Sequence, residues 1–229
     1  MTRKQSSGAT EPAPSLQPEP TFAIVAPGMR WPLVAIAYVL IGVVAIGGAY
    51  WRGFSPWSHP DPWLVFDDNT ERWIYSGLLG ATVAGLVVMS TRALVGRVAF
   101  ATRLHCELRP LARTMSTGTI LYLAASSSLG EELLFRGLLT PWIGLVPQAV
   151  FFGLLHQVGG PSRWVWMGWA LAMGLLLGVM YQCTGSLVGP LSAHALINAI
   201  NLLRLKTFDP LREPKRLGGL LSLGEDRSR

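Results

Sequence analysis

Three charged side chains stand close together inside one of the most apolar stretches of this sequence. The segment GEELLFRG contains Glu131, Glu132 and Arg136, and the only other Asp, Glu, Lys or Arg within residues 114–203 is Arg163. An unpaired charge at the centre of a membrane costs roughly 2.5–3.5 kcal/mol. We therefore expect the three side chains to face protein or a water-filled cavity, with their charges paired or neutralised.

The spacing within this cluster suggests two different roles. Glu132 and Arg136 are four residues apart, on one face of a helix, as in an intrahelical ion pair. Glu131 is turned by about 100° from Glu132 and is free to interact elsewhere. The alternative is a purely structural salt-bridge network of all three residues.

Two later apolar segments supply further polar side chains at helical spacing. The segment FFGLLHQ places Phe152 and His156 on one face, and LSAHALINAIN places His194 and Asn198 on one face. Taken one at a time, a histidine or an asparagine in a membrane helix more often serves as a hydrogen-bonding contact between helices.

The expected depth of these residues in the membrane favours a shared functional site over separate contacts between helices. Turn residues divide the second half of the chain into helices near 117–139, 143–158, 164–182 and 187–204. With a rise of about 1.5 Å per residue, Glu131 and His156 lie about 15 and 20 Å from the first outer turn, and His194 and Asn198 roughly 12–20 Å from the second. A carboxylate, two imidazoles and an amide in one layer form the constellation expected of a buried hydrolytic site.

Composition identifies the class of protein. Half of the 229 residues are hydrophobic and only 14% are charged, which is typical of a membrane protein. Two more apolar segments, from Trp31 to about Tyr50 and over 73–91, precede the helices above. We predict an all-α polytopic bundle of about six transmembrane helices. The net charge of +6 is explained by topology and anionic lipid, and no nucleic-acid partner is expected.

Loop charges predict the orientation. Residues 51–72 carry a net charge of 2 − 4 = −2, and residues 92–115 carry 5 − 1 = +4 and part of them can form an amphipathic surface helix. The positive-inside rule puts the second loop and both termini in the cytoplasm. The predicted division is a disordered tail (1–30), two helices and a basic loop (31–114), a core (115–204) and a cytoplasmic tail (205–229).

The polar segments EELLFR, FGLLH and HALIN resemble, in order, the EExxxR, FxxxH and HxxxN motifs of the CPBP family, which contains the CaaX proteases and bacteriocin-processing enzymes. The resemblance covers roughly residues 115–204. It implies an intramembrane endopeptidase of the glutamic type, formerly described as a metalloprotease, related to the eukaryotic Ras-converting endopeptidase.

Carried onto matching positions, the resemblance implies that Glu131 is the general base that activates water and that His156 is its partner. His194 and Asn198 would donate hydrogen bonds to the developing oxyanion. Glu132 and Arg136 would support Glu131 electrostatically, and Phe152 is the aromatic residue of the second motif.

Two further questions stay open at this stage. No cofactor is expected, but Glu131, His156 and His194 could be zinc ligands, since two His and one Glu is a known catalytic set. Against zinc, neither HExxH nor HxxEH is present. A non-catalytic immunity or assembly protein of the same fold, and a proton-coupled transporter, are the alternative functions. The expected substrate is a peptide or a membrane protein, at the bacterial plasma membrane.

Overall fold

The computed structural model describes residues 30–211, and within this range every regular element is a helix. All of the predicted tail over 1–30 except Arg30, and residues 212–229 of the tail predicted over 205–229, lie outside the described residues. In chain order the helices are α1 (Trp31–Trp51), α2 (Asn69–Leu94), α3 (Ala99–Arg113), α4 (Thr117–Glu132), the π-helix η1 (Leu133–Leu139), α5 (Thr140–Ile143), α6 (Leu145–Leu155), α7 (Arg163–Thr184) and α8 (Val188–Thr207). The predicted all-α class is therefore confirmed.

Three of these helices, α1, α2 and α7, are long and apolar enough to cross a membrane. Helix α6 is apolar but shorter, with 11 residues. This is the composition of a helical membrane bundle, and the number of six spans remains a prediction. The helix predicted over 143–158 was placed wrongly at both ends, because α5 runs through Ile143 and α6 ends at Leu155.

Local sequence explains where several helices begin and end. The side chain of Asp68 accepts a hydrogen bond from the backbone N–H of Glu71 (2.8 Å), and Ser116 does the same for Thr119 (3.0 Å). Both residues satisfy N–H groups that the first turn of a helix leaves free. Helix α7 ends at Thr184 and is capped by Gly185, whose left-handed backbone (φ 66°) is available to glycine at little cost.

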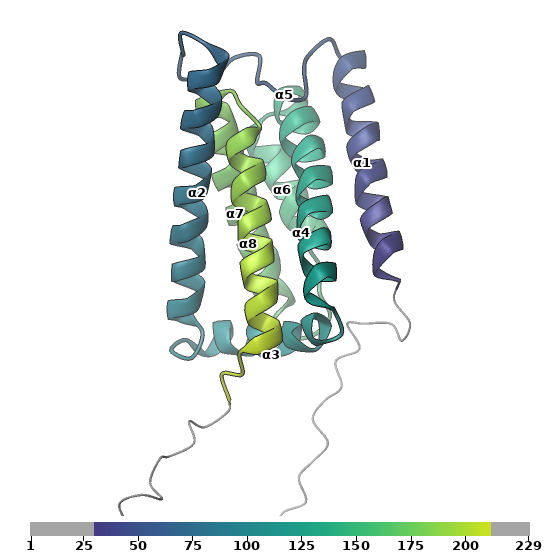
Figure 1. The fold of residues 1–229 in the computed structure, drawn as a ribbon, viewed down its shortest axis with the longest axis vertical. Helices are drawn as coiled ribbons and strands as arrows, with labels where there is room; N and C mark the ends of the chain where they lie inside the picture. Colours follow the sequence, from purple (N-terminus) through teal and green to yellow (C-terminus); the bar gives the residue numbers. More distant parts are fainter. Residues whose placement is uncertain (1–29, 212–229) are drawn as a thin grey trace, which may run out of the picture.

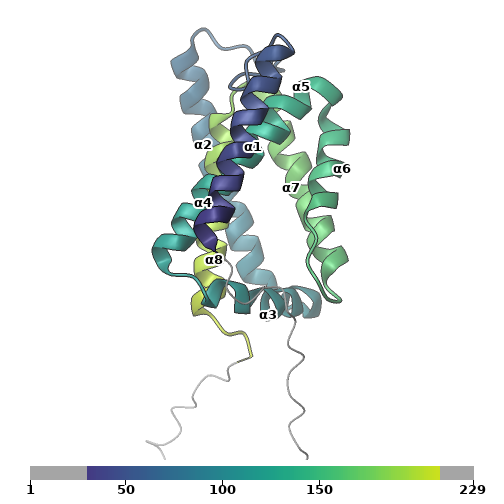
Figure 2. The same cartoon turned by 90° about the vertical axis from the view of Figure 1, so that its right-hand side faces the viewer.

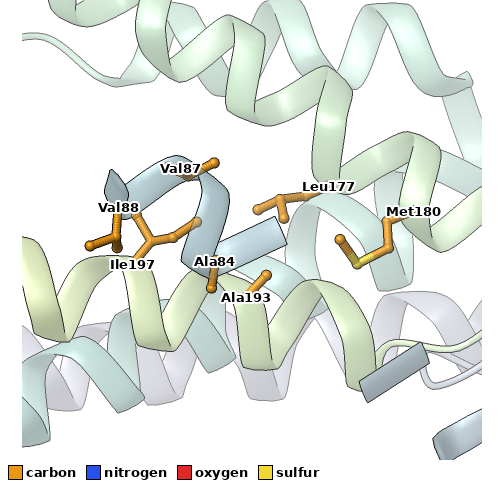
Figure 3. Close-up of a cluster of buried hydrophobic side chains, with 7 residues drawn as sticks. All are labelled: Ala84, Val87, Val88, Leu177, Met180, Ala193 and Ile197. Carbon is orange, nitrogen blue, oxygen red and sulfur yellow. The ribbon is translucent and has the colours of Figure 1, made fainter. Parts of the chain in front are cut away.

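The bundle packs helices that are far apart in the sequence. A buried apolar cluster joins α2, α7 and α8 through Ala84, Val87, Val88, Leu177, Met180, Ala193 and Ile197 (Figure 3). Helix α1 lies at the edge of the bundle and packs against α4 and η1 (Figure 1). Its opposite face exposes large aliphatic side chains such as Val43 and Val44, as expected of a lipid-facing surface.

The two ends of the bundle are closed differently. At one end, the α1–α2 loop is held to the end of α7 by backbone hydrogen bonds from Trp63 to Gln182 (2.9 Å) and from Leu64 to Cys183 (3.0 Å). At the other end, α3 lies across the bundle (Figures 1 and 2), in the segment predicted to contain a surface helix. The first residue of α1 and the last of α8 are at this same end.

Candidate active site

One carboxylate and two imidazoles from three different helical segments converge in the interior. Glu131 Oε2 is 3.6 Å from Nε2 of His156 and 3.8 Å from Nε2 of His194. Glu131 lies near the end of α4, His156 directly after α6, and His194 within α8. The predicted common layer of these three residues agrees with the structure.

His156 is held by its own segment of chain. The residue caps the C-terminus of α6, and its Nδ1 is 2.7 Å from the carbonyl oxygen of Phe152. A carbonyl can only accept, so Nδ1 carries a proton and donates it. In a neutral ring, Nε2 is then the unprotonated nitrogen, and this is the atom that faces Glu131. The centres of the Phe152 and His156 rings are 4.3 Å apart, and this contact restricts the orientation of the imidazole.

His194 is fixed by the neighbouring glutamate. Its Nδ1 is 2.7 Å from Oε1 of Glu132, and the same oxygen accepts a hydrogen bond from Nη1 of Arg136 at 2.8 Å. The Glu132 and Arg136 side chains are both fully buried. The i,i+4 ion pair predicted from the sequence is therefore present, and it also sets the tautomer of a candidate catalytic histidine.

Arg136 connects this pair to the surrounding helices. Its Nη2 donates to the backbone carbonyl oxygens of Gly174 (3.3 Å) and Met173 (3.4 Å) on α7. Its guanidinium lies 4.7 Å from the centre of the Phe152 ring, a cation–π contact. Such partners are what a buried guanidinium requires, and they place Phe152 between Arg136 and His156.

The electrostatic character of the centre follows from these bonds. With both Nδ1 atoms donating, each imidazole in its neutral form presents Nε2 as an acceptor to Glu131, which also accepts. Oε2 of Glu131 is buried and has no hydrogen-bond partner among the described residues. Three acceptors facing one another require a shared proton, a cation or a donor such as water between them. The side chains of Glu131 and His156 are 12% and 23% exposed, so a water molecule can reach the space between them.

Asn198 occupies a neighbouring position. Its Nδ2 lies 3.5 Å from Oγ of Ser127, a buried serine one helical turn before Glu131. The amide thus lies beside α4 about one helical turn from Glu131, and its predicted role as an oxyanion donor stays a prediction. Sequence reasoning did not single out Ser127, whose only signal was its place four residues before Glu131.

Two more features of the site were missed from the sequence. The helix that carries Glu131 continues as the π-helix η1 directly after Glu132, a distortion that often occurs at functional sites. Tyr38 of α1 lies close to Glu131 and interacts with its carboxylate. No local pattern signals the π-helix, whereas Tyr38 was detectable as the only polar side chain in the middle of α1.

The residues that could hold a metal are Glu131, His156 and His194. Within residues 30–211, no group of three or more His, Cys, Asp or Glu residues has the geometry of a metal site. Metal dependence therefore stays a question for experiment. The chemistry of the donor set, two imidazole nitrogens and one carboxylate, would suit zinc if these atoms closed around it.

Comparison with known proteins finds similarity over the part of the chain that contains these residues. Residues 113–200 match the family model of the Rce1-like type II CAAX prenyl endopeptidases. The uncharacterized protein YpbD of Bacillus subtilis is 35% identical over 96 residues, which cover 42% of this chain and 50% of that protein. The chain thus matches about half the length of this curated relative, and no solved structure matches it. The residues Glu131, His156, His194 and Asn198 all lie in the segment that is similar to this family, which we call the Rce1-like region.

Proposed function

We propose that this protein is an intramembrane endopeptidase that uses Glu131 to activate water for hydrolysis of a peptide bond. The observation that carries the proposal is the convergence of the Glu131 carboxylate with two imidazole nitrogens within 3.8 Å, inside the Rce1-like region. A buried acceptor cluster of this kind is suited to bind water and to remove its proton.

In the proposed reaction, water bound between Glu131 and His156 attacks the carbonyl carbon of the scissile peptide bond. Glu131 accepts the proton as the new C–O bond forms, and the carbonyl oxygen becomes an oxyanion. When the tetrahedral intermediate collapses, the C–N bond breaks and the proton passes from Glu131, through His156, to the leaving amine. Nδ1 of His156 is held by its hydrogen bond to the carbonyl oxygen of Phe152, so Nε2 faces Glu131. The same nitrogen therefore serves both the bound water and the proton transfer.

His194 and Asn198 would stabilise the oxyanion. Since Nδ1 of His194 donates to Glu132, this histidine can donate to an oxyanion from Nε2 only as an imidazolium. Preorganised donors in a water-poor site commonly make the largest single contribution to the rate enhancement of acyl transfer.

The proposed mechanism is metal-free, and the proposed substrate is a peptide or a membrane protein. We infer that the protein resides in the bacterial plasma membrane with both termini in the cytoplasm. The inference is supported by the position of the two described chain ends beside α3, where the basic residues Arg103, Arg109 and Arg113 lie. Contacts with anionic lipid would follow from the same charges.

The test is cleavage by purified protein in detergent of a panel of quenched peptides and membrane-anchored reporters. Wild type is compared with His156→Ala and with the control His59→Ala, which alters a histidine in the α1–α2 loop, each with and without a chelator. We expect cleavage by wild type and His59→Ala, loss in His156→Ala, and no effect of the chelator. Activity removed by chelation and restored by zinc would overturn the metal-free mechanism, and a folded wild type that cleaves nothing would favour a non-catalytic role.

A further inference from the structure

Helix α1 lies outside the Rce1-like region, yet it contacts the helix that carries Glu131. The buried residues of α1 are small: Ala35, Gly42, Ala45 and Ala49. Their spacing of seven, three and four residues defines one face, and that face packs against α4 and η1. Tyr38 falls on the same face, between Ala35 and Gly42, and is the one large residue in the row.

Tyr38 is set apart from its neighbours by its environment. The flanking side chains of Ile36, Val39 and Leu40 are 49%, 44% and 58% exposed, as expected toward lipid, while Tyr38 is half-buried. A phenol in the middle of a membrane helix needs a partner for its O–H group. The carboxylate on α4 with which Tyr38 interacts is that of Glu131.

The backbone packing explains how the two helices come close enough. A Cβ atom added to Gly130 would collide with the carbonyl oxygen of Tyr38 and lie 3.2 Å from its Cα. Only glycine therefore permits the approach of α1 to α4 at the residue before Glu131. The same contact places Tyr38 beside the residue that precedes Glu131.

We propose that Tyr38 is a positioning residue for Glu131, with its hydroxyl donating the hydrogen bond that orients the carboxylate toward the two histidines. Oε2 of Glu131 has no hydrogen-bond partner among the described residues, so the Tyr38 bond leaves this atom available to water. This inference rests on the proposed function and gives α1 a part in it. The other charged or titratable groups around Glu131 are His156 on the α6 side, His194 on α8, and Glu132 and Arg136 of its own helical segment.

The test is Tyr38→Phe, which removes one hydroxyl, beside the control Tyr50→Phe, which changes an exposed tyrosine of the same helix. We expect kcat of Tyr38→Phe to fall about tenfold with little change in KM, because a positioning residue acts on the reacting carboxylate and not on the bound substrate. Tyr50→Phe should match wild type. An unchanged kcat in Tyr38→Phe, or a raised KM with unchanged kcat, would overturn the inference.

A double-mutant cycle on thermal unfolding tests the contact without any catalysis. If Tyr38 bonds to Glu131, the shift in Tm caused by Tyr38→Phe is larger in wild type than in a Glu131→Ala background. Equal shifts in both backgrounds would contradict the contact. A coupled cycle in a protein that cleaves no substrate would leave the contact standing while removing the proposed function, so the two failures are distinguishable.

Discussion

His194 and Arg136 bind the same carboxylate oxygen of Glu132, with Nδ1 and Nη1 at 2.7 and 2.8 Å from Oε1. One buried oxygen therefore balances the positive charge of the Arg136 guanidinium and also determines which nitrogen of His194 faces Glu131. The consequence is that stability and the chemistry of the site depend on a single ion pair, and substitutions of its members should affect both.

Arg136→Met should destabilise the protein strongly, because it leaves the buried Glu132 carboxylate without its cation. Breaking a buried ion pair in this way commonly costs about 3–5 kcal/mol. Arg163→Met is the matched control, since Arg163 is exposed at the start of α7. Denaturant unfolding in the same detergent measures the difference, and equal stability of the two variants would show that the pair does not support the fold.

His194→Gln should lower kcat by about 10²–10³ with little effect on KM, because an oxyanion donor acts in the transition state and not on the bound substrate. Initial rates over a range of reporter concentrations separate the two constants. A raised KM with unchanged kcat would instead assign His194 to substrate binding.

Gly130→Ala should lower Tm by several degrees, since the new methyl group meets the Tyr38 backbone and must push α1 away from α4. Gly85→Ala is the control on α2, where an added Cβ finds no atom within 4 Å. That variant should be neutral or slightly stabilising, because alanine favours helix more than glycine does. A Gly130→Ala protein as stable as Gly85→Ala would contradict the close approach.

Stability should fall as the pH drops below about 6.5 because of His105 on the surface helix α3. Burial lowers the pKa of His105; a hydrogen bond with the carbonyl of Phe208 partly opposes this, and the nearby Arg204 and Arg109 lower the pKa further. A histidine with a lowered folded-state pKa is fully stabilising above its unfolded value, near 6.5, and loses that contribution as the pH falls through the folded value. His105→Gln should flatten the Tm profile between about pH 7 and 5, and an unaltered slope would exclude this histidine as the cause.

Much of the site was predictable because charge is so costly in an apolar segment. Glu131, Glu132 and Arg136 had to find partners, and the i,i+4 spacing identified the ion pair correctly. Helix lengths then brought His156 and His194 to the level of Glu131, a prediction that the 3.6 and 3.8 Å separations confirm. Helical spacing alone predicted this common level, because the rise per residue gives the position of each side chain along its helix axis.

What escaped prediction depends on contacts between helices. The hydrogen bond from His194 to Glu132 joins residues 62 positions apart in the sequence. Helical periodicity describes the faces of one helix and cannot predict a contact between two helices. The π-helix η1 likewise has no signature in its apolar sequence. His156 was expected inside a helix but caps its end, where the backbone turns away and allows Nδ1 to reach the carbonyl of Phe152.

The central claim is that Glu131 performs the chemistry, and the most direct measurement is the initial rate of reporter cleavage by Glu131→Gln relative to wild type in the same detergent. Glutamine keeps the size of the side chain and removes its ability to accept a proton from water. We predict a rate at least about 10³-fold lower, with Tm close to that of wild type. A Glu131→Gln protein that cleaves within a few-fold of the wild-type rate would contradict the account.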